Sequence, residues 1–391
     1  MKALDARGFS LPADELARIL SPALLVDLDA VRANVRAILA RCDGDANRWR
    51  PHLKTTKIGP VWRELLRAGI RHFKCATTRE AALFAEVTKA EGIARAELLV
   101  AYPLVGPSRV RLGRLALEHP QVALSLLVEA AEDVDAIPRE LGLFVDVNPG
   151  MDRTGMEAKS SEAVAAITAI ARSAGRRFRG IHFYDGHIHE VEYAPRRAQA
   201  HALYDRLMGL VAELSRQGVP VPEIVTSGTP TLGPALEYGP FRDPARGTVH
   251  RISPGTVVFH DQRTQSECPE LELAPAAVVL ARVVSHPGPA LVTCDAGSKS
   301  IAAEAGDPAA CALGRPELVA RRPSEEHLPF DVTSGPRPPR GSELYLFPRH
   351  VCPTVNLAEQ CVLVERGRIV DVVDVGARAH EVILDRTSPV R

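Results

Sequence analysis

Residues 50–57 read RPHLKTTK, and the lysine at position 54 is the starting point for interpreting this chain. The residues over 47–55 predict a first strand, and Gly59 with Pro60 predicts a helix that begins directly after it. A lysine at the carboxyl end of a barrel strand is well placed to form a Schiff base, and pyridoxal phosphate uses such a lysine. Because a lone lysine is usually a solvated surface group, this interpretation depends on what the rest of the chain supplies.

Short apolar segments recur after this point, and amphipathic stretches lie between most of them. Over 196–217, five residues form one apolar stripe at helical spacing: Leu203, Leu207, Leu210, Val211 and Leu214. Alternating strands and helices predict a parallel sheet, and eight such units predict a (β/α)8 barrel of the TIM type. A doubly wound open sheet is the competing architecture, but no Gly-x-Gly-x-x-Gly motif opens a helix after the first strand. The predicted strands are 47–55, 72–77, 97–103, 122–128, 141–147, 179–185, 223–228 and 249–258, and the predicted helices are 60–68, 78–90, 107–118, 130–137, 160–174 and 196–217.

The character of the sequence changes after Gln262. Segments rich in strand-forming residues are separated there by stretches rich in proline, glycine and charge, which predicts a second, mostly β domain. The predicted strands are 273–284, 290–295, 343–347, 360–364 and 368–375, and 316–340 is predicted to be an irregular connection. Residues 22–28 predict one more strand, which we expect to join the β domain, and 29–40 predict a helix leading into the barrel. The predicted organisation is an N-terminal segment 1–28, a cofactor-binding barrel 29–262 and a C-terminal β domain 263–391.

The composition excludes several classes of protein. Lysine plus arginine and aspartate plus glutamate number 48 each, so nothing indicates a nucleic-acid-binding tail or a basic membrane face. No apolar run reaches the roughly 18 residues of a membrane span, and residues 1–13 lack the apolar core of a secretory signal. The seven cysteines are scattered, which favours a reducing cytoplasm over a disulfide framework. We therefore expect a cytoplasmic protein that acts on a small molecule.

Polar residues follow the predicted barrel strands where each strand ends, which is where active sites form in barrels. The loops after the seventh and eighth strands commonly bind phosphate, and hydroxyl and amide groups can do so without a fixed cation. Either loop alone could be an ordinary Gly/Thr turn. Their pairing opposite Lys54 favours a phosphorylated aldehyde. The candidate phosphate-binding residues are Ser227, Gly228 and Thr229 in one loop and Gly255 in the other, and Ser253 and Thr256 beside Gly255 are further candidates for binding the cofactor.

Four motifs in this order resemble the fold type III pyridoxal phosphate enzymes, whose barrel is of the alanine racemase type. They are the Lys54 segment, GMDRTG at 150–155, YDGH at 184–187 and SGT at 227–229. The segment 50–57 is more similar to the branch that contains D-threonine aldolase, D-serine dehydratase and the 3-hydroxyaspartate aldolases and dehydratases. The resemblance runs from about residue 20 to 376 and includes DAG at 295–297 and HVCPTVNL at 350–357.

The resemblance implies a role for each matching residue. Lys54 would carry the cofactor, Arg153 would donate to its phenolic oxygen, and Tyr184 would pack near its pyridine ring. The Ser227 and Gly255 loops would hold its phosphate. In the racemase branch an arginine in the eighth strand faces the pyridine nitrogen, and Ser253 stands at the matching position here. A hydroxyl cannot stabilise a protonated pyridinium as a carboxylate would. The sequence therefore does not identify the group that sets the protonation state of the pyridine nitrogen.

His350 and Cys352 form a candidate metal pair. We expect the pair in a strand or loop of the β domain, and in a strand positions i and i+2 face the same side, so both side chains could reach one ion. Imidazole and thiolate are typical zinc ligands, although a chance His-x-Cys is common. The resemblance implies a divalent metal at this place beside the cofactor. Because thiolate is a soft ligand, we expect zinc, with manganese or magnesium as alternatives.

These features predict a metal-assisted lyase of 3-hydroxy D-amino acids, with the D configuration implied by the resemblance alone. A dehydratase of the D-serine or 3-hydroxyaspartate type, giving a 2-oxo acid and ammonia, is preferred. A D-threonine aldolase-type cleavage to glycine and an aldehyde is the alternative, and its base would be His187 or His189. An amino-acid racemase or a non-catalytic cofactor carrier is less consistent with the metal pair and the added domain. The resemblance also implies a homodimer.

Overall fold

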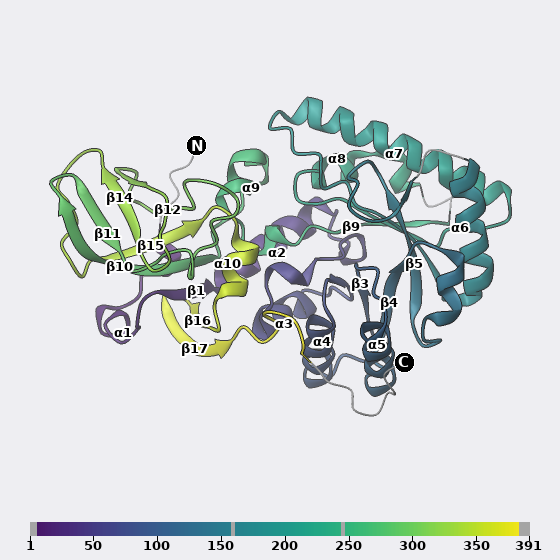
Figure 1. The fold of residues 1–391 in the computed structure, drawn as a ribbon, viewed down its shortest axis with the longest axis horizontal. Helices are drawn as coiled ribbons and strands as arrows, with labels where there is room; N and C mark the ends of the chain where they lie inside the picture. Colours follow the sequence, from purple (N-terminus) through teal and green to yellow (C-terminus); the bar gives the residue numbers. More distant parts are fainter. Residues whose placement is uncertain (1–5, 158–160, 244–246, 383–391) are drawn as a thin grey trace.

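The computed structural model describes residues 6–157, 161–243 and 247–382. The chain forms an α/β barrel and a mostly β unit beside it, with the N-terminal strand and the C-terminal third of the chain in the β unit (Figure 1). Among the described residues, no helix combines the length and apolar character that a membrane span requires.

The barrel sheet is parallel throughout. Its strands are hydrogen-bonded in the order β2 (His72–Cys75), β3 (Ala96–Val100), β4 (Val122–Val128), β5 (Gly142–Asn148), β7 (Phe178–Phe183), β8 (Glu223–Thr226) and β9 (Val249–Ile252). The short strand β6 (Met156–Glu157) pairs with β5 alone. This arrangement confirms the predicted barrel class.

Residues 49–52 join the two ends of this sheet. Trp49 bridges to Ile252 on β9, and His52 bridges to Lys74 on β2. The prediction of a regular strand over 47–55 is wrong, because 46–48 and 53–55 are 3-10 turns. Proline at position 51 has no N–H to give to a ladder, which limits the strand to isolated bridges. The Lys54 turn therefore begins directly where the sheet closes.

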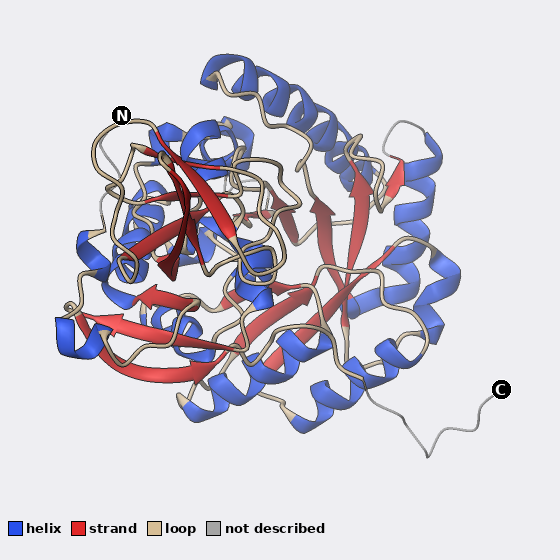
Figure 2. Cartoon of the chain, turned by 60° about the vertical axis from the view of Figure 1, so that its left-hand side comes forward, coloured by secondary structure: helices blue, strands red, loops and turns tan. Residues whose placement is uncertain are grey.

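Helices surround the barrel sheet (Figure 2). Their boundaries follow local signals: Thr77 caps α4 by accepting a hydrogen bond from the Glu80 amide at 3.1 Å. The apolar stripe predicted over 196–217 is buried along α7. The segment 130–137, predicted as a helix, is a 3-10 turn over Ala131–Ala136 instead. The helices of the chain are α1 (Ala13–Leu16), α2 (Leu28–Arg41), α3 (Gly59–Arg67), α4 (Thr78–Ala90), α5 (Pro107–Glu118), α6 (Ser161–Ala174), α7 (Tyr193–Arg216), α8 (Leu232–Glu237), α9 (Gln262–Glu267) and α10 (Val351–Leu357).

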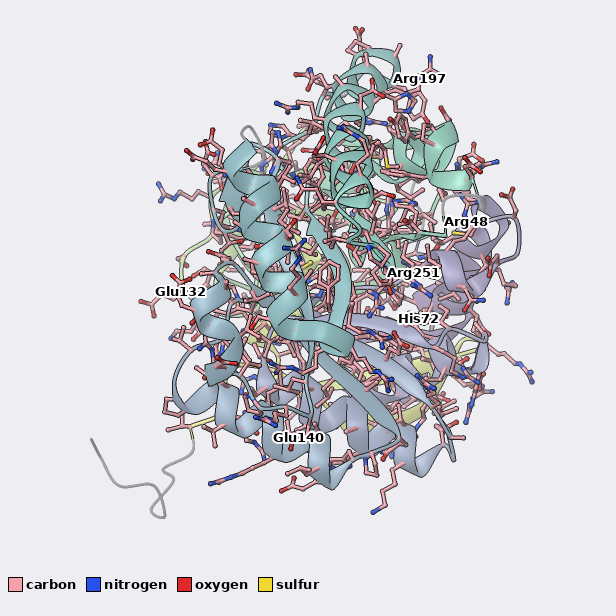
Figure 3. The ribbon with its side chains drawn as sticks, turned by 90° about the vertical axis from the view of Figure 1, so that its right-hand side faces the viewer. Arg48, His72, Glu132, Glu140, Arg197 and Arg251 are labelled. Carbon is pink, nitrogen blue, oxygen red and sulfur yellow. The ribbon has the colours of Figure 1, made fainter. Side chains whose placement is uncertain are left out.

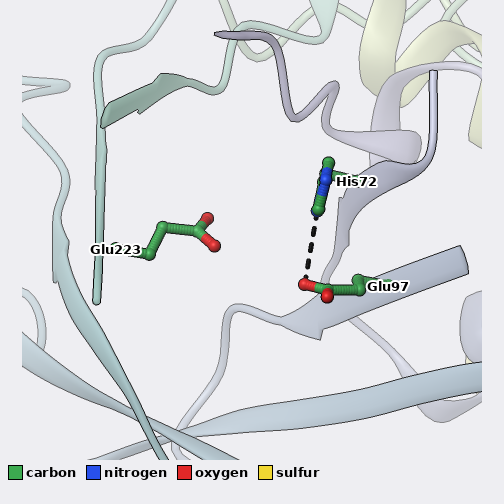
Figure 4. A group of neighbouring side chains, drawn as sticks. All are labelled: His72, Glu97 and Glu223. Carbon is green, nitrogen blue, oxygen red and sulfur yellow. Dashed lines mark hydrogen bonds and ion pairs between the residues drawn. The ribbon is translucent and has the colours of Figure 1, made fainter. Parts of the chain in front are cut away.

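An ion-pair network fills the amino end of the barrel. Arg50, only 1% exposed, pairs with Glu223 at 2.8 Å, and Arg251 pairs with the same carboxylate at 2.6 Å. Glu97 pairs with His72 at 3.3 Å and with Arg179 at 3.1 Å. Figure 3 labels His72 and Arg251, and Figure 4 shows His72, Glu97 and Glu223 facing one another.

His72, Glu97 and Glu223 lie close enough together to bind one metal ion. Burial alone would raise the pKa of Glu97, but the His72 hydrogen bond and the Arg50 charge outweigh it and hold the pKa well below its ordinary value. Arg50 and Arg251 already neutralise Glu223. We therefore interpret the cluster of His72, Glu97 and Glu223 as structural; it lies at the end of the barrel opposite Lys54.

The β unit is built around the N-terminal strand. β1 (Ala23–Asp27) lies between β10 (Ala277–Gly288), which is antiparallel to it, and β16 (Gln360–Glu365), which is parallel. The segment 316–340, predicted to be irregular, contains two short strands, and Pro329 lies within one of them. The remaining strands are β11 (Leu291–Cys294), β12 (Ala310–Ala312), β13 (Leu318–Ala320), β14 (Leu328–Val332), β15 (Glu343–Pro348) and β17 (Arg368–Asp374). The division at residue 262 stays a prediction.

Candidate functional site

A cavity of about 640 Å³ opens at the carboxyl ends of the barrel strands and is bounded on one side by α10. Most of the predicted site residues line it, although they come from loops far apart in the sequence. Those that line it are Lys54, Arg153, Tyr184, His189, Gly228, Thr229, Ser253, Gly255, Thr256, His350 and Cys352. A second cavity, of about 770 Å³, lies against β1 and β16 in the β unit and contains none of the predicted residues.

Lys54 lies in the 3-10 turn Leu53–Thr55 and is half-buried. Its backbone N–H donates to Nδ1 of His52 at 3.4 Å, and its amine donates to none of the described residues. Burial, followed by the charges of Lys54 and Lys74, lowers the pKa of His52 well below its ordinary value. The imidazole is therefore neutral and can accept the Lys54 N–H. The Lys54 amine is left free at the cavity wall.

Gly255 allows the eighth-strand loop to approach the Lys54 turn. A Cβ atom at this position would lie 2.3 Å from the carbonyl oxygen of His52, closer than real Cβ contacts allow. The backbone amides of Gly255, Thr256 and Thr229 donate no hydrogen bond to the described residues. Three free donors in adjacent loops suit an anionic group.

The Ser227 loop matches the phosphate prediction only in part. Ser227 has a positive φ of 63°, and its buried Oγ atom has no hydrogen-bond partner among the described residues. The amide of Gly228, predicted to be a phosphate donor, already donates to Asp185 Oδ1 at 3.2 Å. Asp185 also accepts from Tyr204 at 2.5 Å and from Thr231 at 2.8 Å. A buried carboxylate therefore fixes this loop, and Ser227 is fully buried and does not line the cavity.

Aromatic and cationic groups meet at Tyr184. The guanidinium of Arg153 lies 5.3 Å from the centre of the Tyr184 ring, and the amine of Lys74 lies 5.1 Å from it. His182 stacks against the same ring at 6.3 Å and bonds Asp146 at 2.7 Å. The sequence analysis did not identify Lys74. Lys74 could have been recognised from the alternation of polar His72 and Lys74 with apolar Phe73 and Cys75, because alternate side chains of a barrel strand point to the barrel interior.

The metal pair does not lie in a strand. His350 is the N-cap residue of α10, and Cys352 lies in the first turn of that helix. The prediction of a shared strand face is therefore wrong, although both side chains do line the cavity. Nδ1 of His350 lies 2.5 Å from Glu304 Oε1, which leaves Nε2 as the ligand atom. The Sγ atom of Cys352 lies 3.1 Å from Thr55 Oγ1 and 3.6 Å from Thr256 Oγ1.

Cys352 differs electrostatically from the other cysteines. Burial alone would raise the pKa of Cys352, but the His350 hydrogen bond and charge, with Lys54, lower it. Burial alone would lower the pKa of His350, but Cys352 and Glu304 raise it to about 9. Burial raises the pKa of the remaining cysteines, all of which are free: Cys42, Cys75, Cys268, Cys294, Cys311 and Cys361. Cys352 is thus the thiol best suited to bind a soft cation.

The two candidate histidine bases are placed differently. His189 is exposed and lines the cavity. His187 is half-buried and does not line it, and its Nδ1 atom is buried without a partner among the described residues. Other cavity residues that the sequence analysis did not identify include Asp261, Arg263, Glu304 and His380.

Comparison with known proteins gives consistent matches over both parts of the chain. Residues 26–256 match the model of the alanine racemase N-terminal domain, and residues 276–364 match that of a serine dehydratase domain. The chain is 31% identical to D-threonine aldolase of Arthrobacter sp, over 95% of this chain and 97% of that protein. It is 27% identical to D-threo-3-hydroxyaspartate dehydratase of Delftia sp. (strain HT23), over 87% of this chain and 93% of that protein.

A solved structure agrees with these matches. The crystal structure of D-threonine aldolase from Filomicrobium marinum superposes with a TM-score of 0.80 at 25% identity, and the match covers 93% of this chain and 96% of that one. Alanine racemase of Clostridium difficile 630 superposes with a TM-score of 0.65 at 14% identity, covering 92% of this chain and 100% of that one, which shows a shared fold.

Proposed function

This chain belongs to the family with the alanine racemase N-terminal domain, and on that premise we propose that it is a pyridoxal-phosphate-dependent, metal-assisted lyase of 3-hydroxy D-amino acids. The observation that carries the proposal is the meeting of three groups in one cavity: the Lys54 amine, the unpaired donors of two loops, and the His350–Cys352 pair. The relatives named above are a D-threonine aldolase and a D-threo-3-hydroxyaspartate dehydratase, which supports this substrate class.

The cavity residues fit the cofactor. Lys54 would hold its aldehyde carbon, and the amides of Thr229, Gly255 and Thr256 would hold its phosphate. Ser227, whose buried hydroxyl does not line the cavity, stays a predicted phosphate donor. Gly228 would contribute through its small size, because a Cβ atom there would lie 3.2 Å from the Tyr184 hydroxyl. Arg153 and Tyr184 would lie beside the ring. When bound, pyridoxal phosphate supplies the electron withdrawal that weakens the bonds to the substrate's Cα.

The donor set at α10 fits a divalent metal, with zinc preferred over manganese or magnesium. His350 offers Nε2 and Cys352 offers a thiolate. Two solved variants of a D-threo-3-hydroxyaspartate dehydratase replace a histidine and a cysteine two positions apart, and the cysteine variant is described as being in the metal-free form. When bound, the ion would supply Lewis acidity toward the substrate hydroxyl.

We propose a dehydratase as the preferred outcome, with retro-aldol cleavage as the alternative. A cysteine two positions after a histidine, the spacing of the two residues replaced in those dehydratase variants, supports dehydration. The 31% identity to a D-threonine aldolase favours the alternative. Lys54 would take the proton from Cα in a dehydration. His189, which lines the cavity, would take the hydroxyl proton in a cleavage, and it is better placed for this than His187.

Product analysis separates these outcomes. The purified protein, loaded with pyridoxal phosphate and zinc, is incubated with D-serine, D-threonine and D-3-hydroxyaspartate, and the matching L-amino acids serve as controls. A dehydratase gives a 2-oxo acid with ammonia, whereas an aldolase gives glycine with an aldehyde. Conversion of neither D nor L substrates would contradict the lyase assignment, and interconversion of the enantiomers without cleavage would favour a racemase. A homodimer stays a prediction, which size-exclusion chromatography with light scattering checks.

A further inference from the structure

Lys74 is a buried lysine that none of the roles above employs. It lies on β2, is 1% exposed, and its amine donates to the Oγ atom of Ser253. Among the described residues, no carboxylate forms an ion pair with this amine. Lys57, which is also buried, is by contrast held by Glu80 at 2.6 Å. Lys57 is therefore a paired structural lysine, and Lys74 is not.

The surroundings of Lys74 disfavour a full positive charge. Burial lowers the pKa of Lys74 well below its ordinary value, and the Lys54 charge lowers it further. The nearby carboxylates, Asp185 and Asp146, favour the charged form but bond Tyr204 and His182 respectively. A buried amine without a counter-charge lowers the stability of the fold. Its presence therefore indicates a function for the hydrogen bond that the amine donates.

The histidines, lysine and arginines near Lys74 carry no negative charge that could pair with its amine. His52 and His182 both have their pKa lowered, by burial first, and are therefore neutral near pH 7. Arg50 and Lys54 are the nearby cations. With Arg153 on the same aromatic ring, the wall around Tyr184 and Ser253 is basic.

Ser253 connects Lys74 to the cavity. Its hydroxyl accepts from Lys74, donates to the carbonyl oxygen of Ser227 at 3.1 Å, and lines the cavity. A hydroxyl has one hydrogen, which can go to that carbonyl or to an acceptor in the cavity. Because Lys74 donates to the oxygen, it polarises the hydroxyl and makes it a stronger donor.

We propose that Lys74 is a positioning residue that acts through Ser253 and keeps the pyridine nitrogen of the bound cofactor unprotonated. This inference rests on the proposed function. A relay from Lys74 through the Ser253 hydroxyl offers a donor to a nitrogen with a free lone pair, and no carboxylate among the described residues forms an ion pair with Lys74 or a hydrogen bond with the Ser253 hydroxyl. A lysine on the second strand would thereby do the work that an arginine on the eighth strand would otherwise do. A poorly protonated ring is a weaker electron sink, which suits a lyase whose metal shares the activation of the substrate.

The protonation state of the pyridine nitrogen can be measured directly by NMR. Pyridoxal phosphate labelled with ¹⁵N in the ring is bound to the protein, and its resonance is followed as a function of pH. The variants are Lys74→Met, Ser253→Ala and Lys74→Arg, and Lys89→Met serves as a control because Lys89 is an exposed lysine on α4. In the wild type the nitrogen should be unprotonated at pH 7.

Lys74→Met and Ser253→Ala should each raise the titration midpoint of the nitrogen by about one unit or more. Lys74→Arg and Lys89→Met should keep the wild-type midpoint. A protonated nitrogen in the wild type at pH 7 would overturn the inference, as would an unchanged midpoint in Ser253→Ala, which decides the question if Lys74→Met does not fold. Failure of the proposed function would appear separately, as a wild type that forms no visible band with pyridoxal phosphate, and would overturn both.

Discussion

The Sγ atom of Cys352 lies 3.1 Å from the Oγ1 atom of Thr55, the residue that follows Lys54. Lys54 belongs to the barrel, whereas Cys352 belongs to the short helix α10, almost 300 positions later in the sequence. This contact brings the amine predicted to carry the cofactor and the thiol predicted to bind the metal into one cavity.

Replacing Lys54 should remove the cofactor linkage without unfolding the chain. The Lys54 amine donates to no described residue, so Lys54→Ala breaks no native hydrogen bond of the side chain. We expect the visible absorbance of the bound cofactor to disappear and turnover to fall by several orders of magnitude, as measured by absorbance titration and steady-state kinetics. Lys89→Ala, which removes an exposed lysine of α4, should keep both properties. A retained visible band in Lys54→Ala would contradict the assignment.

Removing the metal should separate activity from cofactor binding. A chelator should abolish turnover while the visible band remains, because the candidate ligands His350 and Cys352 lie at the start of α10 and the candidate cofactor lysine lies in the barrel. Zinc added back should restore activity. Cys352→Asp should shift the preferred ion from zinc toward manganese or magnesium, since carboxylate is a harder ligand than thiolate. Full activity after exhaustive chelation, confirmed by elemental analysis, would exclude a metal role.

Glu304 should orient the histidine ligand. Its Oε1 atom lies 2.5 Å from Nδ1 of His350, which fixes the ring and leaves Nε2 for the ion. Glu304→Gln should weaken zinc binding by about 10-fold to 100-fold in a competition assay with a chromogenic chelator. Glu325→Gln, an exposed glutamate that pairs with Lys299 in the β unit, is the matched control and should bind zinc as the wild type does. Equal zinc affinity in the two variants would remove the orienting role.

The ion-pair network at the amino end of the barrel should be important for stability and not for catalysis. Glu223→Gln removes the carboxylate that pairs with Arg50 and Arg251, and leaves Glu97, 3.4 Å from Arg50, as the remaining counter-charge for two buried arginines. We expect a loss of about 3–5 kcal/mol in the free energy of unfolding, as measured by urea titration. The cofactor band and the zinc affinity of the folded variant should match those of the wild type. An unchanged urea midpoint would show that the network contributes little.

The same network should make stability depend on acid pH through Glu97. The pKa of Glu97 lies well below its ordinary value of 4.5, because His72 and Arg50 outweigh the effect of burial. A depressed carboxyl pKa contributes stability that is present above the ordinary value and is lost as the pH falls through the folded-state value. The difference in unfolding free energy between wild type and Glu97→Gln should therefore be largest at pH 7 and should shrink below pH 4.5. A difference that grows in acid would contradict this origin.

Sequence patterns predicted the elements whose boundaries depend on local signals. The helix 78–90 was placed correctly because Thr77 is a good N-cap residue, and the stripe of leucines over 196–217 identified α7. The strand 47–55 was predicted too long because Pro51 interrupts the ladder. The short strands within 316–340 gave no alternating pattern long enough to recognise.

The candidate site was predictable where residue type alone carries the chemistry. Lys54, Arg153, His350 and Cys352 were all found in one cavity. The use of the Gly228 amide by Asp185 could not be predicted, because it depends on how two loops pack. Lys74 was missed for a related reason: its significance comes from the absence of a counter-charge, which only the packed barrel reveals.

The location of both candidate metal ligands at the start of α10 has an evolutionary consequence. The candidate ion-binding pair consists of the N-cap residue and a first-turn residue of one short helix, while the proposed phosphate site is assembled from barrel loops. A change of the single codon for position 352 could therefore alter which metal ion binds, without changing the residues proposed to bind the cofactor. Related chains could then differ in the reaction they catalyse while they keep the same barrel.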